Sequence, residues 1–461
     1  MFKKIEIWIL YLTILIGILI MLAFGVLVRQ EIEGITKKGN IDISPLSRPA
    51  AYIARLPEQV LREVFSDPNK LDKPWLEQRD FYNQDGFNGT QNTEESFLLL
   101  SRYDGDLKEG VVELIDLTTF EIVHTWNPDL DAFNALVEQV DEFENIVRDG
   151  NNKRQTLVHP KLTEDGGLFF GSMPLRKIDS CSKLIFQNTH DNFHHSIESD
   201  VDGNIWVSSY MYPQSISEEK VGRNYGDGGY LDDAIVKLSV DGKILFEKSV
   251  SQIFIDHSLE YLLFSVGDMQ FDYDPIHLND IQPVNYDSQY WKKGDVFLSL
   301  RHQSMILLYR PSTNEIIWTG TGPFFHQHDV DILDEHRISI FNNNSKDFVD
   351  GDVVDGHNEV IIYDFKTDEY YSYLKGSMIE NDVRTITGGR SQILQNGDLI
   401  IEEDNFGRTL YFNKDGTLRW SYVNRAENGS VYKLGWSRIL YTQSDIKIVR
   451  NFMHNKGDCN E

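Results

Sequence analysis

Basic residues are few in this sequence of 461 residues: 44 lysines and arginines stand against 72 aspartates and glutamates, which gives a formal net charge of −28. The basic stripe that neutralises phosphates is missing, so a nucleic-acid-binding function is excluded. An acidic chain of this kind is typical of a soluble exported domain, and it would attract anionic substrates only through local cationic pockets. The length is enough for one large all-β domain or two ordinary ones.

Cysteine is scarcer still. The two cysteines, Cys181 and Cys459, are far apart in the chain, and the second lies in a polar tail at residues 455–461. This pattern predicts no disulfide framework and leaves the redox compartment undecided. Helical periodicity is also almost absent outside an N-terminal apolar run and residues 130–147, which excludes helical solenoids.

The N-terminal apolar run covers residues 5–28 and is interrupted only by Glu6 and Thr13. It is long enough to cross a bilayer as one helix. Lys3 and Lys4 precede it, and this positive bias predicts a cytoplasmic N-terminus with the rest of the chain on the periplasmic or other extracytoplasmic side. A cleaved signal peptide is the alternative. The run is longer than a usual signal-peptide core and lacks a convincing small-x-small cleavage site, which favours a single-pass signal-anchor.

The chain after this run divides into three parts. Residues 30–95 are punctuated by prolines, show one short helical pattern at residues 57–65, and are expected to form a linker or accessory segment. Residues 96–445 show short alternating strands separated by Asp-Gly and Asn-Gly turns, the signature of antiparallel hairpins. Residues 446–461 form the polar C-terminal tail.

The strands fall into repeated units that begin at or near a histidine or arginine. The second to sixth units begin at His159, His195, His277, His328 and Arg390. Residues 195–207 align with residues 328–340 without a gap. Repeats of this length with four strands each predict an all-β, six-bladed β-propeller with antiparallel blades. The first unit has three strands, so we expect the run at residues 434–442 to supply its missing innermost strand and close the ring.

In a propeller, the starts of the innermost strands converge at one mouth of the central channel. The five unit starts, together with Arg301 after a second strand, should therefore form a cationic pocket. Such a pocket suits an oxyanion such as sulfate or phosphate. A divalent metal held by the histidines and Asp329 is the competing interpretation, and Arg301 disfavours it. A neutral imidazole nitrogen can also attack a sulfuryl or phosphoryl group.

Several motifs around these residues resemble the signature of bacterial arylsulfate sulfotransferases, the arylsulfotransferase family, over residues 95–440. They are His277-x-Asn279-Asp280-Ile281, Ser299-Leu300-Arg301-His302-Gln303, Ile317-Trp318, Gln327-His328-Asp329, Phe341-Asn342-Asn343-Asn344, Gly388-Gly389-Arg390 and Leu394-x-Asn396-Gly397-Asp398. The chain departs from the family pattern in three ways. The segment between Arg301 and His328 lacks a cysteine pair, no separate N-terminal β-domain is evident, and a membrane anchor replaces a cleaved signal.

The resemblance implies a periplasmic transferase that moves a sulfuryl group from an aryl sulfate to a phenolic acceptor. It implies a ping-pong path through a sulfohistidine without an adenylylated sulfate donor, and we expect no cofactor or metal. Carried over by motif, His328 is the nucleophile, Arg301 and His277 hold the sulfuryl oxygens, and His195 completes the catalytic set. His194 is an alternative to His195. The further substrate-binding candidates are His194, Asn279, His302 and Arg390.

Two other functions stay open on the sequence. The first is a non-catalytic, membrane-anchored propeller that binds an anionic ligand or a partner protein at the same mouth. The second is a metal-dependent hydrolase or lyase of sulfated or uronate sugars, which would need more carboxylates at the unit starts than the sequence provides. The joint presence of His195, His277, Arg301 and His328 favours the transferase. The physiological donor and acceptor and the oligomeric state are not determined by the sequence.

Overall fold

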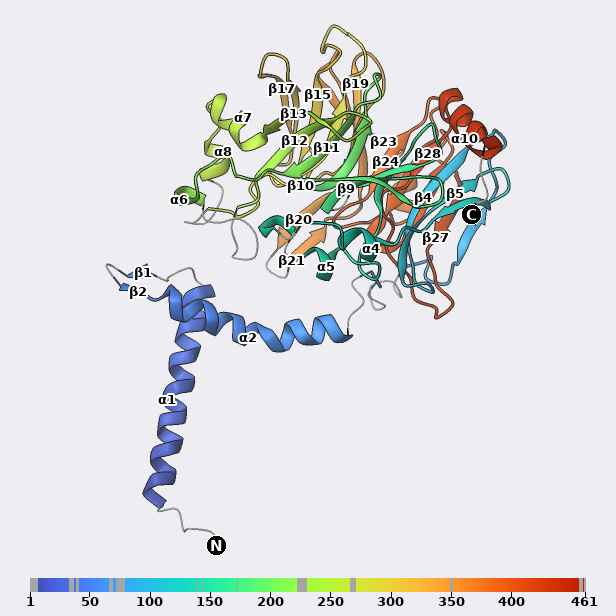
Figure 1. The fold of residues 1–461 in the computed structure, drawn as a ribbon. Coiled ribbons are helices and arrows are strands. Elements are labelled where there is room, and N and C mark those ends of the chain that lie inside the picture. The colour runs from blue at the N-terminus through green and yellow to red at the C-terminus, as the bar shows by residue number, and fades with distance from the viewer. Residues whose placement is uncertain are drawn as a thin grey trace. The chain divides into compact units, whose positions relative to one another are not determined.

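The computed structural model describes residues 7–32, 37–38, 41–65, 69–71, 79–138, 140–143, 145–171, 173–221, 230–265, 271–348, 351–455 and 459. The chain divides into two compact units, Met1–Pro68 and Asn69–Glu461 (Figure 1). The second unit contains all of the predicted site residues.

The first unit contains two helices, α1 (Ile7–Ile32) and α2 (Ser44–Phe65), and the short strands β1 (Lys37–Lys38) and β2 (Ile41–Asp42). Among the described residues, α1 is the one helix that is long and apolar enough to cross a membrane, and its side chains are not buried in the protein. This confirms the predicted apolar helix. The short helix predicted at residues 57–65 is wrong in extent, because α2 begins at Ser44 and continues through Pro49 and Pro57. Each interior proline removes one backbone hydrogen bond without ending the helix.

Most of the second unit is built from antiparallel sheets of consecutive strands in a propeller-like arrangement. Four sheets are small, with four or five strands each. They are β28 (Arg438–Leu440), β4 (Phe97–Asp104), β5 (Glu109–Asp116) and β6 (Glu121–Trp126); β14 (Leu278–Pro283), β15 (Val296–Leu300), β16 (Met305–Arg310) and β17 (Glu315–Thr321); β18 (Val330–Ile332), β19 (Arg337–Asn342), β22 (Glu359–Asp364) and β23 (Glu369–Tyr373); and β24 (Arg390–Ile393), β25 (Leu399–Glu403), β26 (Arg408–Phe412), β27 (Leu418–Val423) and β3 (Gly86–Gly89).

Among the residues that it describes, the structure does not contain six separate four-stranded sheets, one for each predicted blade. In place of the second and third units stands one seven-stranded sheet. Its strands in chain order are β7 (Val158–Leu162), β8 (Leu168–Gly171), β9 (Met173–Ile178), β10 (Leu184–Ser199), β11 (Ile205–Tyr210), β12 (Asp233–Leu238) and β13 (Ile244–Ser249). The first half of β10 pairs with β9 and the second half pairs with β11. One long strand therefore belongs to both units and joins them.

The ring closes as the sequence predicted. Strand β28, near the C-terminus, pairs antiparallel with β4, with Arg438 opposite Leu99 and Leu440 opposite Phe97. A second closure was not predicted: β3, which lies in the expected linker, pairs with β27 as the fifth strand of the last sheet. Both pairings cover edges that would otherwise be open to other chains.

The core lies between neighbouring sheets, and this explains why the middle strands read as continuous apolar runs. All five residues of β15 are buried. Leu298 packs in one apolar cluster and Phe297 packs in another, on the opposite face of the same strand. Because side chains alternate along a strand, both faces of the sheet must be apolar when a neighbouring sheet covers each of them.

Short helices and one hairpin decorate the sheets. The hairpin consists of β20 (Ser345–Phe348) and β21 (Gly351–Val354), inserted between β19 and β22. The remaining helical elements are α4 (Leu130–Asn134), η1 (Asp141–Phe143), α5 (Ile146–Asp149), α6 (Glu218–Val221), α7 (Val250–Asp256), α8 (Tyr261–Phe264), α9 (Lys375–Glu380), η2 (Asp404–Phe406) and α10 (Gln443–Asn455). Helix α10 occupies much of the expected polar tail.

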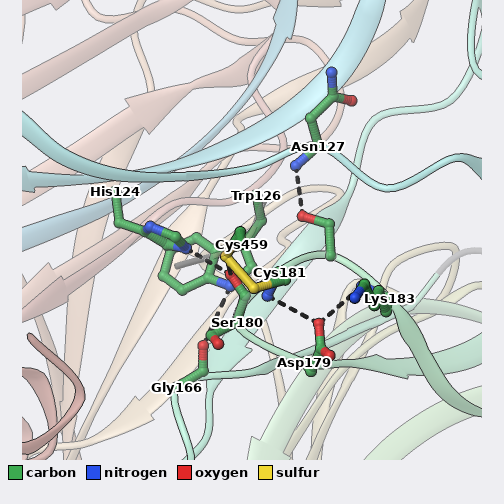
Figure 2. The surroundings of a disulfide bond; sticks show 10 residues. His124, Trp126, Asn127, Gly166, Asp179, Ser180, Cys181, Lys183 and Cys459 are labelled. Atoms are coloured by element: carbon green, nitrogen blue, oxygen red, sulfur yellow. Dashed lines mark hydrogen bonds between the residues drawn. A yellow bond between two sulfur atoms is a disulfide. The ribbon is translucent and has the colours of Figure 1, made fainter. Parts of the chain in front are cut away.

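The two cysteines form a disulfide, contrary to the expectation from their spacing. Cys181 and Cys459 are bonded across a sequence separation of 278 residues. Figure 2 shows the bond beside His124 and Trp126, at the turn between β9 and β10. Phe452 of α10 stacks on Trp126, with ring centroids 5.7 Å apart, so the helix leads the tail back to this turn. The distance between the two cysteines along the chain was therefore a poor guide to whether they bond. Closure of the ring brings the end of the chain back to the turn between β9 and β10, where Cys181 lies.

Candidate functional site

A cavity of about 710 Å³ collects most of the predicted site residues. Its lining includes six of the eight, namely His194, His195, His277, Arg301, His302 and His328. These side chains come from the seven-stranded sheet and from the sheets that begin at β14 and β18. Asp274, Asp352, Asp404 and Trp436 also line the cavity.

The backbone at the strand starts is unusual in a repeated way. His159, His195, His277 and Trp436 all have positive φ, between 46° and 64°. At the three histidines the pairing register also shifts nearby, as in a β-bulge. Bulges re-aim side chains, and a non-glycine residue in the left-handed region is held there only by its surroundings. The repeat therefore includes a local conformation that turns each of these side chains off the sheet.

The gapless alignment of the third and fifth units holds in three dimensions. Ile197 pairs with Val207 in one sheet, and Val330 pairs with Ile340 in the other. The aligned positions are thus also equivalent in register, so His195 and His328 occupy corresponding places. Their ring centroids lie 6.3 Å apart.

His328 is held in one tautomer by its surroundings. Its Nδ1 lies 2.7 Å from Oδ1 of Asn343, and its Nε2 accepts the backbone N–H of Gly388 at 2.8 Å. The amide of Asn343 cannot turn round, because its Nδ2 donates to the carbonyls of Thr385 and Gly388. This network assigns the proton to Nδ1 and leaves the lone pair on Nε2.

The His328 imidazole is neutral at ordinary pH. Burial lowers its pKa well below the usual value, and the charge of Arg301 and the proximity of His277 lower it further. The pKa of His195 is lowered in the same way, by burial first and then by the neighbouring histidines and Arg301. A cationic pocket of this kind keeps these two imidazoles unprotonated, as a nucleophile requires.

His194 and His195 form a pair. Their Nδ1 atoms are 2.7 Å apart, so one ring donates the proton and the other accepts it. The ring of His194 stacks on Tyr210, with centroids 4.1 Å apart. The ring of His195 lies 5.1 Å from that of His277. Of the two candidates, His195 is the one with contacts to the other site histidines.

Arg301 is held from two sides, and its Nε has no hydrogen-bond partner among the described residues. Its Nη1 lies 2.6 Å from Nε2 of His302, and its Nη2 donates to Asp352 at 3.2 Å. Asp352 comes from the β20–β21 hairpin. The Nε of Arg301 is buried without a hydrogen-bond partner among the described residues. A buried donor without a partner is costly, and an oxyanion in the cavity would satisfy it.

Asp274 orients His277. Its Oδ2 lies 2.6 Å from Nδ1 of His277. Burial alone would raise the pKa of Asp274, but the hydrogen bond with His277 and the nearby histidine charges outweigh it and hold that pKa below its usual value. Asp274, His277 and His302 are close enough to share a metal ion. Both nitrogens of His302 are already used, by the Asp274 carbonyl and by Arg301, so this group is a poor metal site.

Asp404 is a cavity residue that the sequence did not indicate. Burial and then the charge of Glu402 raise its pKa to about 7. Thr385 donates to its Oδ1 at 3.2 Å. Gly388, whose N–H binds His328, packs directly against the carboxylate: a Cβ at this glycine would lie 2.0 Å from Oδ2 of Asp404. A carboxyl group that titrates near neutrality can give or take a proton.

Two predicted site residues, and one unit start, do not line the cavity. Asn279 is fully buried and donates to the backbone carbonyl of Gln327 at 3.0 Å, which ties two neighbouring sheets together. Arg390 is buried and donates to the Ser437 carbonyl. His159 is buried as well, and its Nδ1 accepts a backbone N–H from β10. Arg390 and His159 stand at unit starts, and Asn279 stands in the same motif as His277, which explains why the sequence grouped them with the cavity residues.

Comparison with known proteins adds the family. A family model described as arylsulfotransferase (ASST) matches residues 160–425. No curated protein matches the chain. Similar solved structures include a protein of unknown function from Bacteroides caccae, with 12% identity, a TM-score of 0.43, and coverage of 71% of this chain and 93% of that one. TolB from Acinetobacter baumannii has 10% identity, a TM-score of 0.40, and coverage of 87% and 74%.

Proposed function

Because the chain belongs to the arylsulfotransferase family, we propose that it transfers a sulfuryl group from an aryl sulfate ester to a phenolic acceptor through a sulfohistidine at His328. The observation that carries this proposal is the state of that histidine. It is buried and neutral, its Nδ1 proton is held by Asn343, and its Nε2 keeps a lone pair. These are the requirements for nucleophilic attack on sulfur.

In the first step, Nε2 of His328 attacks the sulfur atom. The new S–N bond forms as the S–O bond to the aryl group breaks, and the phenolate leaves with the electron pair of that bond. Arg301 and His277 bind the sulfuryl oxygens, and the unused Nε of Arg301 provides a donor for them. The Gly388 N–H, which bonds to Nε2 at rest, becomes free to donate to a sulfuryl oxygen.

In the second step, the acceptor phenol attacks the same sulfur atom. The S–N bond breaks and its electron pair returns to Nε2 of His328. Asp404, whose pKa is raised to about 7, gives a proton to the departing phenolate in the first step and takes one from the attacking phenol in the second. His195, with His194 behind it, completes the pocket, and His302 holds Arg301.

The finer points of fold and location belong to the same proposal. The seven-stranded sheet acts as two blades that share β10, which makes a six-bladed ring. Helix α1 anchors the protein, and the propeller lies on the extracytoplasmic side, as the Lys3 and Lys4 bias suggests. The disulfide supports this side of the membrane, since disulfides persist in oxidising compartments.

The test is an assay of the full-length protein in detergent. With 4-nitrophenyl sulfate and a phenol acceptor, we expect release of nitrophenol together with sulfation of the phenol. With the donor alone, rapid quenching and intact-protein mass spectrometry should detect one added sulfuryl group, and peptide mapping should place it within residues 325–331. Ligand binding without any release of nitrophenol would contradict the proposal and favour a non-catalytic, anion-binding propeller.

A further inference from the structure

Three further side chains with ligand atoms gather away from the cavity lining, on the seven-stranded sheet. His190 and Asp191 lie in β10, and Glu247 lies in β13. Each offers one ligand atom, and these atoms lie within 4.8 Å of one another. Asp191 is fully buried, whereas the side chain of His190 is half exposed. The group is therefore partly buried and reachable from solvent.

The two carboxylates lie close together, and each has one oxygen without a partner in the described part of the chain. Oδ2 of Asp191 accepts a hydrogen bond from Ser209 at 2.9 Å. Oδ1 of Asp191 and Oε1 of Glu247 are both buried and have no hydrogen-bond partner among the described residues. Nε2 of His190 lies 3.4 Å from Oε2 of Glu247. Two neighbouring carboxylates with buried, unpartnered oxygens are costly for a fold.

We propose that His190, Asp191 and Glu247 form a binding site for a divalent transition-metal cation. One imidazole nitrogen and two carboxylate oxygens are a donor set for Zn²⁺ or Mn²⁺, whereas Ca²⁺ prefers six to eight oxygen ligands. Three protein ligands leave further positions for water, and the exposed side of His190 is where water can enter. The cation would satisfy the buried oxygens of Asp191 and Glu247.

The site has a structural consequence within the sheet. Residues 192–195, which directly follow Asp191 in β10, line the cavity, whereas Glu247 belongs to β13, three strands away in the sheet order. A bound cation would connect the middle of β10 to this outer strand. We therefore expect the metal to stabilise the seven-stranded sheet.

The competing explanation is a proton shared by the two carboxyl groups. Without a cation, burial and the contact with Glu247 raise the pKa of Asp191 to about 8, and a protonated Asp191 would donate to Glu247. The two explanations differ in what the protein binds, so the test measures metal content and not pH dependence.

The test uses the full-length protein in detergent, stripped with a chelator and then titrated with Zn²⁺ or Mn²⁺. Bound metal is measured by elemental analysis after gel filtration, and affinity by calorimetry. We expect one equivalent per chain and a raised Tm. Asp191→Asn, Glu247→Gln and His190→Ala should each weaken binding by about 10- to 100-fold or more. His190→Ala changes a half-exposed residue, so it keeps the test informative should a buried variant fail to fold.

Two controls locate the metal. Asp241→Asn, in the turn between β12 and β13, removes one exposed carboxylate of the same sheet. The amount of bound metal per chain should stay unchanged in this variant. The double variant His277→Ala, His302→Ala removes two members of the group formed with Asp274. It should still bind one equivalent of metal. Failure of the wild type to bind either metal, or loss of the metal in the double variant alone, would overturn the proposal. Binding of Ca²⁺ in preference to both would overturn the assigned class of cation.

Discussion

The innermost strands carry two levels of side chains, and the levels differ in chemistry. At the cavity, the strand starts present histidines and a tryptophan. Two or three residues further along the same strands, the side chains are charged: Asp280 and Arg438 are buried, and Glu198 and Asp331 are partly buried. The pairs are His195 and Glu198, His277 and Asp280, His328 and Asp331, and Trp436 and Arg438.

The deeper level is a network of opposite charges. Arg438 donates to Glu198 at 2.9 Å, and Nε of Arg390 lies 3.8 Å from Asp329. Arg438 holds the pKa of Glu198 below its usual value despite the burial that opposes this, whereas burial and the charge of Asp329 raise the pKa of Asp280 and Asp331 well above theirs. We infer that this level joins the sheets, because its charges face one another. The cavity level instead places the neutral imidazoles of His195 and His328 at the cavity lining, together with Arg301, whose buried Nε has no hydrogen-bond partner among the described residues. We therefore expect the residues at the strand starts to serve reactivity and the charged residues further along the same strands to serve stability.

The largest expected effect is at the cavity level. His328→Asn should abolish sulfuryl transfer, because an amide nitrogen cannot form the covalent intermediate. Its thermal unfolding should stay close to that of the wild type. Nitrophenol release and the mass of the quenched protein measure the effect. Robust turnover of the variant, with the sulfuryl group on another residue, would move the nucleophile to His195 or His277.

The opposite result is expected at the deeper level. Glu198→Gln removes the negative charge that pairs with the buried Arg438 and should lower the free energy of unfolding by about 3–5 kcal/mol. Because the folded state lowers the pKa of Glu198, its contribution is present above the ordinary glutamate pKa and is lost on acidification. The difference between wild type and variant in urea unfolding should therefore shrink below about pH 4. A Glu198→Gln variant that is as stable as the wild type but inactive would contradict the assignment of the deeper level to stability.

Arg301 tests whether the cavity needs a guanidinium or only a positive charge. Arg301→Lys should lose about 2–4 kcal/mol of transition-state stabilisation, because an ammonium cannot reproduce the fork of donors. The matched control is Arg310→Lys, which changes an arginine paired with Asp295 outside the cavity lining and should leave kcat/KM unchanged. Equal losses in the two variants would show that the effect is not specific to the site.

The disulfide lies outside both levels, so its loss should change stability alone. Cys459→Ser should lower the free energy of unfolding by about 2–4 kcal/mol, while transfer by the folded protein stays unchanged. Reduced wild type should unfold at the same urea concentration as the variant. If wild type and variant unfold together without reductant, then the bond is not formed in the mature protein.

The smallest effect is expected from Asp404 with an activated donor. Nitrophenolate needs little help from a proton, so Asp404→Asn should slow release from 4-nitrophenyl sulfate by less than about tenfold, or 1.4 kcal/mol. With unsubstituted phenyl sulfate, whose phenolate needs a proton, the wild-type rate of sulfohistidine formation should fall above pH 7 as Asp404 loses its proton. The variant should be slow and independent of pH there. An unchanged pH profile in the variant would exclude Asp404 as the acid.

Much of the site could be predicted from the sequence because the repeat is a matter of short-range pattern. Alternating strands and Asp-Gly turns fix where each unit begins, and equivalent starts in a closed ring must converge, which brought His195, His277 and His328 together. The first unit likewise had only three strands in the sequence and needed a fourth, and β28 supplies it.

Other features of the site and the fold depend on contacts that the sequence repeat does not mark. Asp352 and Asp404 line the cavity, and Asn343 holds His328. They come from the ends of second strands or from an inserted hairpin, where no repeat marks them, although Asn343 stands in a motif that the sequence already singled out. Arg390 stands at an expected start and Asn279 stands two residues after one, yet their side chains bond between sheets. The fusion of two units through β10 and the bond from Cys181 to Cys459 were also decided by tertiary structure. Local pattern determines which residues face the centre of a ring, but partners distant in the chain decide what those residues touch there.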